Sequence, residues 1–452
     1  MLRSASDETI PERITTWTVL DLAWPIMVSM LSHTFMGVTD TLFVGWLGTA
    51  PLAGLGIALT LVYTLQAFPI GLTSGLKVAA SQRVGAGRHD AALRLTWQGL
   101  WLSLILGTFI AALSGYSQPL LSMMTDSQAV IEEGAAFLQI RLLGVPILFT
   151  VFSLSALYHG RGETRTPMVA TLIGNVVNAA LDPLFIFTLD LGIAGAALAT
   201  LAGLSVNCGW LAFRLRGDLW AADSQIEWRW MKEIGDVGSP LGARFFLDNL
   251  SFVLFAAMLS MIGDAHMAAH ILSIRIVSVS FLPGYAVAEA SSVLVGQAIG
   301  ARRVDLARIA WKRAMGFASA LMAAMGLVFW IFPDLLLSGF GAESEVFALG
   351  RDLLRVAAVF QIFDAVAMVG LSSLNGANDT RFTMIVSVGA AWLVKLPVGY
   401  LLAVQYQMGA VGAWWGLLAE IVVLAGIVFW RLMGSAWLDR RLKDTEPLAT
   451  AT

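Results

Sequence analysis

The chain has 452 residues, of which 58% are hydrophobic and 13% are charged, and its mean hydropathy is +0.76. Soluble globular domains carry about 25% charged residues, so this composition excludes an ordinary soluble protein. Apolar runs that can cross a hydrocarbon core of about 30 Å recur along the whole chain. We therefore predict an all-α polytopic membrane protein surrounded by membrane lipids. We expect no nucleic acid partner for a chain with a formal net charge of −3.

The apolar runs predict about twelve membrane spans, six in each half of the chain. Those of the first half are 17–46, 52–75, 93–115, 134–158, 167–188 and 192–214. Those of the second half are 235–262, 267–293, 309–333, 347–374, 382–404 and 410–433. Between the halves lies a polar segment. We predict an N-lobe (1–214), a cytoplasmic linker (215–234), a C-lobe (235–434) and a cytoplasmic tail (435–452).

Basic residues occupy alternate loops between the predicted spans. The loops that contain no Lys or Arg are 47–51, 116–130, 263–266, 334–345 and 405–409. Basic loops remain on the cytoplasmic side of a membrane. We therefore expect a multi-pass protein of the cell (inner) membrane with both termini in the cytoplasm.

The two halves resemble each other in sequence. TRTPM (164–168) recurs in the second half as TRFTM (380–384), and GIAGA (192–196) recurs at a nearly equal offset as GAVGA (409–413). Six spans per repeat is an even number, so the repeats have the same orientation and are related by a parallel pseudo-twofold axis. Parallel repeats are typical of transporters that rock two lobes around a central site.

The sequence favours transport over catalysis. It contains no GxxxxGK[ST] phosphate-binding loop, so an ion gradient is the expected energy source. His266 and His270 share a helix face but lack the glutamate of an HExxH motif, and we predict no metal site. An intramembrane protease with paired aspartates is the enzymatic alternative, which the repeat and the absence of a protease motif disfavour. We expect a protein that is not an enzyme.

Four aspartates lie well inside predicted spans. They are Asp40, Asp182, Asp248 and Asp364. At about 2.5–3.5 kcal/mol per charged residue, burying them in lipid would cost on the order of 10–14 kcal/mol. They must therefore face a cavity or a polar partner.

Helix geometry places one group of polar residues at a common depth. Asp40, Asp182 and Thr200 each lie eight residues from the end of a span, about 12 Å below the outer surface at 1.5 Å per residue. Asn178 lies one turn deeper on the face of Asp182, and Pro183 leaves one backbone carbonyl of its helix without a donor. These oxygens suit a small cation or a pair of acids that share a proton.

The acids of the second half have two interpretations. Asp364 and Lys395 are predicted at similar depths on adjacent spans, and so are Asp248 and Arg275. Each pair is either a structural ion pair or part of a cation site. The sequence leaves both interpretations open for Asp248 and Arg275, and we predict that Lys395 pairs with Asp364.

Five segments together resemble the multidrug and toxic compound extrusion (MATE) family in its bacterial form, and the resemblance covers the whole chain. They are VTDTLFVGWLG (38–48), GRGETRTPM (160–168), GNVVNAALDPLFIF (174–187), FQIFDAV (360–366) and NGANDTR (375–381). The resemblance implies a secondary active antiporter that exports bulky, mostly cationic organic compounds in exchange for Na⁺ or H⁺. It implies no cofactor besides that coupling ion, and we expect a monomer.

The resemblance also implies roles for individual residues. Asp40, Asn178, Asp182 and Thr200 match the cation cluster of the N-lobe, and the backbone of Ala196 joins them. Pro25, in the first span, matches the proline at which that helix bends in some members of the family.

In the C-lobe, Asp248 and Asp364 match the acids of NorM-type members, with Asp248 in place of an expected glutamate. Both site types are present, so the NorM-type and DinF-type branches remain open. The alternative function is a flippase for lipid-linked oligosaccharides or lipids from the same superfamily. A basic central cavity is expected of such a flippase, whereas here the four aspartates outnumber the deep bases Arg275 and Lys395.

Overall fold

The structure is a computed structural model that describes residues 13–340 and 344–439. Within these ranges it contains eleven helices that are long and apolar enough to cross a membrane. The bent pair α5 (Gln128–Leu143) and α6 (Val145–Gly160) makes a twelfth span if it is counted as one. The prediction of an all-α protein with about twelve spans is confirmed.

The fourth predicted span is not a straight helix. It bends by 44° at Gly144, between α5 and α6. Pro146 stands in the first turn of α6 and has no backbone N–H to donate to α5, so the helix ladder is interrupted at this point.

The chain forms two compact units. Of the described residues, the amino-terminal unit comprises 28–84 and 88–242, and the carboxyl-terminal unit comprises 13–27, Gly85–Gly87, 243–340 and 344–439. Two long helices, α1 (Thr16–Gly45) and α9 (Trp228–Ile262), therefore contribute to both units. Each changes unit two residues after an internal proline, Pro25 in α1 and Pro240 in α9.

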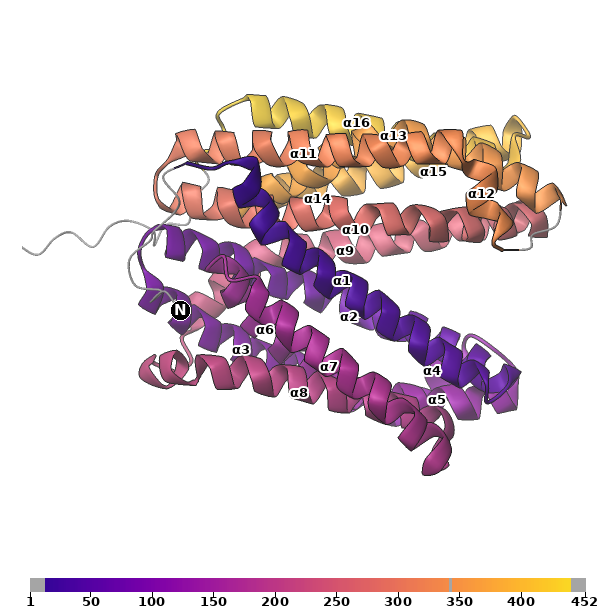
Figure 1. Ribbon diagram of the computed structural model, residues 1–452, viewed down its shortest axis with the longest axis horizontal. Coiled ribbons are helices and arrows are strands. Elements are labelled where there is room, and N and C mark those ends of the chain that lie inside the picture. Colours follow the sequence, from indigo (N-terminus) through magenta and orange to yellow (C-terminus); the bar gives the residue numbers. More distant parts are fainter. Residues whose placement is uncertain (1–12, 341–343, 440–452) are drawn as a thin grey trace, which may run out of the picture. The chain divides into compact units, whose positions relative to one another are not determined.

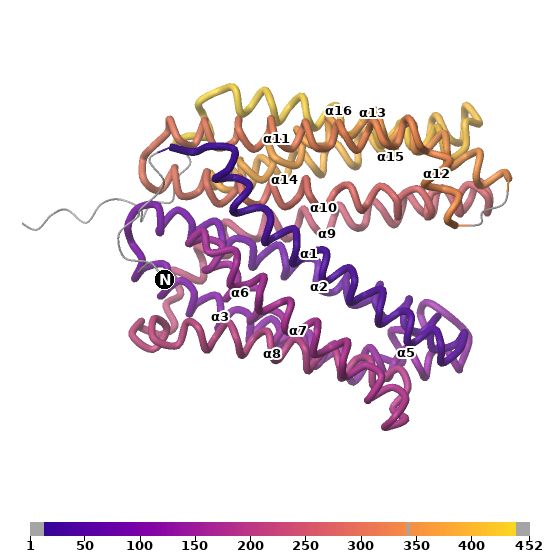
Figure 2. Tube along the Cα trace, viewed as in Figure 1, coloured from indigo at the N-terminus to yellow at the C-terminus, as the bar shows by residue number. Residues whose placement is uncertain are grey.

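The amino-terminal unit contains most of α1 and the helices that follow it, which Figure 2 traces in indigo to magenta. They are α2 (Thr49–Gly85), α3 (His89–Ala111), α4 (Ser117–Ser122), α5, α6, α7 (Arg165–Pro183) and α8 (Gly192–Ala221). Helices α7 and α8 run side by side. Between α8 and α9, only residues 222–227 of the predicted linker 215–234 are not helical.

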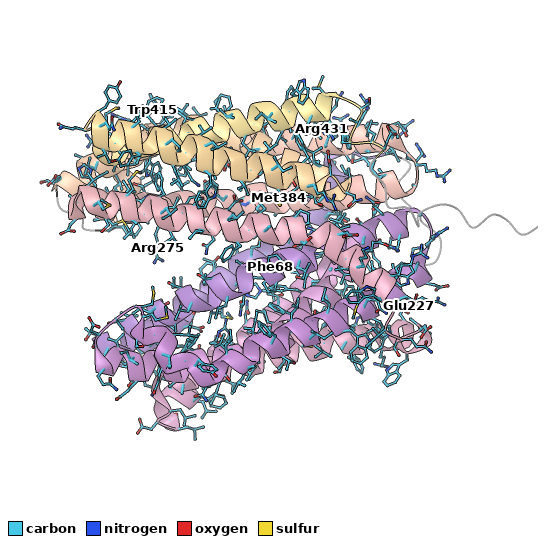
Figure 3. All side chains as sticks on the ribbon, turned by 180° about the vertical axis from the view of Figure 1, so that it is seen from behind. Phe68, Glu227, Arg275, Met384, Trp415 and Arg431 are labelled. Carbon is cyan, nitrogen blue, oxygen red and sulfur yellow. The ribbon has the colours of Figure 1, made fainter. Side chains whose placement is uncertain are left out.

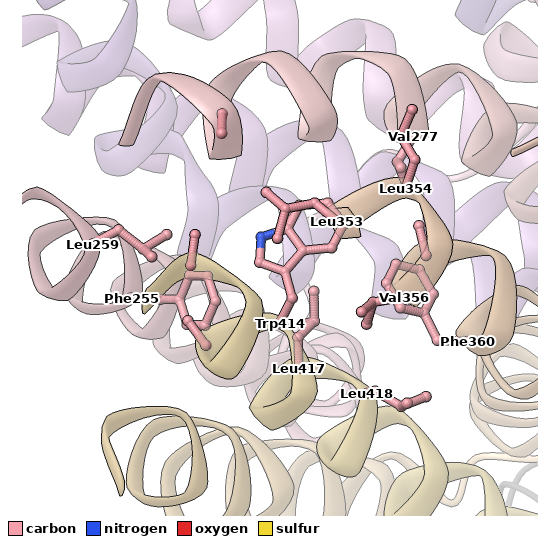
Figure 4. Close-up of a cluster of buried hydrophobic side chains, with 14 of the residues drawn as sticks. Phe255, Leu259, Val277, Leu353, Leu354, Val356, Phe360, Trp414, Leu417 and Leu418 are labelled. Carbon is pink, nitrogen blue, oxygen red and sulfur yellow. The ribbon is translucent and has the colours of Figure 1, made fainter. Parts of the chain in front are cut away.

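The carboxyl-terminal unit packs α13 (Ser344–Gly376) against three long helices, as Figure 1 shows. These helices are α10 (Asp264–Gly300), α11 (Val304–Ile331) and α16 (Gly409–Met433). Shorter elements complete the unit: α12 (Pro333–Ser338), α14 (Thr380–Ala390) and α15 (Leu396–Tyr400). Buried aromatic side chains hold α9, α13 and α16 together, with Trp414 next to Phe360 and near Phe255 (Figure 4). From residue 440 onward, the predicted tail lies outside the described residues.

The internal repeat is visible in the backbone of the turns. Every described residue with positive φ has a counterpart at the equivalent turn of the other repeat. The pairs are Gly48 and Gly263, Gly87 and Arg302, Gly162 and Asn378, Asp190 and Gln407, and Gly192 and Gly409. Both repeats also form a π-helical turn, at Leu184–Thr188 before Asp190 and at Leu401–Gln405 before Gln407. The turns are therefore the same in both repeats, even where the residue is no longer glycine.

Candidate functional site

Glycines allow the two helices of the amino-terminal site to approach closely. A Cβ added to Gly174 on α7 would lie 2.6 Å from the carbonyl oxygen of Gly203 on α8, so their backbones are in contact. On α7, Asn175 donates a hydrogen bond of 2.6 Å to the hydroxyl of Ser32 on α1. The three helices α1, α7 and α8 are thereby joined one turn from the predicted polar residues.

The structure brings the predicted polar residues of this unit into one buried cluster. Asp182 and Asn178 are fully buried on α7, and Asp40 on α1 and Thr200 on α8 are 8% and 6% exposed. The amide of Asn178 satisfies both of its ends when Nδ2 donates to Asp40 Oδ1 (3.2 Å) and its oxygen accepts from the N–H of Thr200 (3.2 Å). Asn178 therefore connects α1 to α8.

The two carboxyl groups of the cluster face each other. Asp40 and Asp182 lie within hydrogen-bonding reach of one another. Among the described residues, the buried Oδ2 of Asp182 has no hydrogen-bond donor. Two buried carboxylates at this range require either a proton between them or a positive ion. Such a pair can take up a proton or a small cation.

The structure also shows what surrounds the cluster on α7 and α8. The helix does not end at Pro183, because the chain continues into the π-helical turn Leu184–Thr188. Such turns often occur at functional sites. The carbonyl oxygen of Ala196 lies beside the cluster and accepts a hydrogen bond of 2.9 Å from the Thr200 hydroxyl.

One functional candidate was missed in the sequence. Arg141 on α5 lies close enough to Asp40 for their charges to interact, and its Nε has no acceptor among the described residues. It lines a small cavity together with Gln66, whose side chain is buried. An arginine inside the fourth predicted span was the available signal.

In the carboxyl-terminal unit, the predicted pairing of Lys395 with Asp364 is wrong. Lys395 is 1% exposed, and its Nζ lies 3.3 Å from Glu420 Oε2 on α16. It also donates to the hydroxyl of Ser251 (2.9 Å) and lies 4.0 Å above the ring of Phe252. Glu420 was not predicted, although it lies inside the twelfth predicted span.

The ion pair of Asp248 with Arg275, one of the two interpretations left open by the sequence, is not formed. Asp248 Oδ2 accepts from Nε of Arg244 at 3.3 Å, one turn earlier on α9. Arg275 lies on α10 with an exposed side chain and is labelled in Figure 3. Asp364 on α13 lies near Glu420, and its buried Oδ2 has no hydrogen-bond donor among the described residues.

The two clusters occupy equivalent places in the two repeats. The offset that relates Gly192 to Gly409 also relates Asn178 to Lys395 and Gly203 to Glu420. The helix pair that carries an amide and a glycine in the first repeat therefore carries an ammonium and a carboxylate in the second. The carboxyl-terminal cluster contains its own positive charge where the amino-terminal cluster has a neutral amide.

The two histidines of α10 have structural partners. His266 Nδ1 accepts from the backbone N–H of Ala410, and His270 Nδ1 accepts from the indole N–H of Trp414, both at 3.2 Å. Each histidine thus connects α10 to α16.

The described residues form eleven or twelve membrane spans in two repeats, and each repeat has a buried polar cluster on equivalent helices. These features define a secondary transporter. The family model MatE matches residues 25–184 and again 240–401, once in each repeat. The chain belongs to the MatE family, the multidrug and toxic compound extrusion transporters.

Relatives agree with this family, and solved structures have the same fold. The chain is 29% identical to a probable multidrug resistance protein NorM of Pseudomonas syringae, over 89% of this chain and 91% of that protein. It is 26% identical to a protein of the same description from Thermotoga maritima, over 95% and 94%. A MATE structure in the bent conformation has a TM-score of 0.87 at 23% identity, covering 92% of this chain and 94% of that one. An outward-facing multidrug resistance MATE transporter has a TM-score of 0.86 at 24% identity, covering 92% and 95%.

Proposed function

We propose that the protein exports bulky, mostly cationic organic compounds in exchange for Na⁺ or H⁺ and that the coupling ion binds between Asp40 and Asp182. The observation that carries the proposal is that these two buried carboxyl groups face each other, with Asn178 bridging α1 and α8. A proton or a small cation at this position removes the repulsion between the two carboxylates. Binding of the ion therefore changes the electrostatic interaction between α1 and α7.

The surrounding residues support different roles for the two aspartates. Arg141 supplies a positive charge near Asp40, and this charge attracts the Asp40 carboxylate. Asp182 then exchanges the ion, since one of its oxygens has no donor among the described residues. The π-helical turn after Pro183 gives α7 a place to bend when that charge changes.

The carboxyl-terminal cluster has a different role in this proposal. The ammonium of Lys395 already lies against Glu420, and Arg244 lies against Asp248. A small cation would have to displace or be repelled by these fixed charges. We therefore propose that the coupling ion binds in the amino-terminal unit and that Lys395 acts as a resident cation in the other.

The names of the relatives support drug export over lipid flipping. The proteins from Pseudomonas syringae and Thermotoga maritima are both described as probable multidrug resistance proteins. The excess of acidic over basic side chains inside the spans is smaller than the sequence indicated. Arg141 and Arg244 add to the bases, while Glu420 adds to the acids. The acids still exceed the bases, which suits a cationic substrate.

The basic loops of the sequence support a cytoplasmic location for both termini, and we propose that the protein functions as a monomer in the inner membrane. Ethidium efflux from reconstituted vesicles, measured under a Na⁺ gradient and a pH gradient separately, tests the proposed function. Efflux driven by at least one gradient and abolished when both are collapsed supports antiport. Ethidium movement at a rate independent of both gradients would refute antiport.

A further inference from the structure

A basic recess lies where the beginning of α1 meets the beginning of α11, which Figure 1 shows next to each other. Its volume is about 670 Å³. Its basic lining residues are Arg13, Arg303, Lys312 and Arg313, and the one acidic residue is Asp305. All belong to the carboxyl-terminal unit.

The acidic residue of the recess is already engaged. Asp305 accepts two hydrogen bonds, of 3.0 and 3.1 Å, from the guanidinium of Arg303. Arg13, Lys312 and Arg313 are exposed and form no ion pair within the described parts of the chain. Three positive charges therefore face one recess without a counter-ion among the described residues.

Part of the recess lining is apolar. Its lining residues Ile14 and Leu306 are buried, and Ile309 is 39% exposed on the same stretch of α11 as the basic residues. Uncompensated positive charge beside exposed aliphatic surface at the end of a membrane helix matches an anionic phospholipid, with a phosphate above and an acyl chain below. A soluble anion would use only the charged part.

We propose that this recess binds the headgroup of an anionic phospholipid and so fastens the beginning of α1 to α11. The phosphate oxygens contact Arg13, Lys312 and Arg313, and the acyl chain follows Ile309. Because Arg13 precedes α1 and the other two residues lie on α11, a bound lipid joins two segments that are remote in sequence. The position of α1, which also carries Asp40, then depends on the lipid composition of the membrane.

Native mass spectrometry of the purified full-length protein tests the proposal with equal amounts of phosphatidylglycerol and phosphatidylcholine. The wild type should retain phosphatidylglycerol preferentially, and the triple variant Arg13→Gln, Lys312→Gln, Arg313→Gln should lose that preference. Each single substitution should weaken retention about fivefold, the equivalent of about 1 kcal/mol per basic residue at an anionic surface. Because the substituted residues are exposed, we expect all variants to fold. Elution as a single size-exclusion peak checks this expectation.

Arg308→Gln is the matched control, since Arg308 lies in the same turns of α11 but does not line the recess. It should retain the lipid like the wild type. Equal retention by the triple variant would overturn the proposal. Displacement of the lipid by millimolar inorganic phosphate would also overturn it, because a free anion would then be the ligand. Neither result involves drug or ion gradients, so each is distinguishable from a failure of the antiport proposal.

Discussion

Replacing Lys395 by methionine should destabilise the protein severely, and the structure identifies the partner that determines the loss. The ammonium lies 3.3 Å from Glu420 Oε2, and the two side chains are 1% and 12% exposed. Removing one member of a buried ion pair leaves an uncompensated charge and typically costs about 3–5 kcal/mol. We expect a loss in this range for Lys395→Met, in the free energy of unfolding measured in mixed micelles.

The double variant Lys395→Met, Glu420→Gln removes both charges and should recover most of that loss. The expected coupling energy is therefore on the order of 3 kcal/mol, near the upper end for residues in contact. Asp364→Asn in place of Glu420→Gln is the control, because Asp364 does not pair with Lys395, and its rescue should be much smaller. Additive losses for Lys395 and Glu420, or a stronger rescue through Asp364, would refute this assignment.

Three further predictions concern the amino-terminal cluster. Gly203→Ala should lower stability by about 1–3 kcal/mol and impair transport, because its Cβ would lie 2.4 Å from the carbonyl oxygen of Gly174 and 3.1 Å from the Cβ of Asn178. Gly209→Ala on the same helix meets nothing within 4 Å and should cause no loss in the same unfolding and efflux assays. Arg141→Gln should tighten Na⁺ binding several-fold in isothermal titration, because it removes a positive charge that repels Na⁺ near the site; unchanged affinity would exclude this repulsion. Na⁺ affinity should fall as the pH falls, by at most about tenfold per pH unit, because a proton competes for the same carboxyl pair; a pH-independent affinity would contradict a shared pocket.

Counting residues from span ends found the amino-terminal cluster because depth along a helix depends only on the rise per residue. The same count failed for Lys395, since equal depth does not determine which faces of two helices meet. That orientation is set by packing at small residues, here by Gly416 of α16, whose added Cβ would lie 2.5 Å from Cα of Gly399. This contact lies one turn from both Lys395 and Glu420.

The unit boundaries inside α1 and α9 could not be read from hydropathy, because an apolar run shows where a helix crosses the membrane but not what it packs against. The first part of α9 belongs with the amino-terminal unit because its backbone contacts α2 at glycines. A Cβ on Gly71 or Gly75 would lie 2.5 or 2.7 Å from Gly242 or Gly238. The bend at Gly144 did have a local signal, the proline two residues later.

Gradient-driven ethidium efflux by the variant Asp182→Asn in proteoliposomes tests the central claim most directly. Asparagine keeps the size of the side chain and removes the carboxyl group that exchanges the coupling ion. We predict that the purified variant is folded and still binds ethidium, but that efflux under Na⁺ and pH gradients is abolished. Efflux at the wild-type rate by Asp182→Asn, and also by Asp40→Asn, would show that this cluster is structural and that coupling occurs elsewhere.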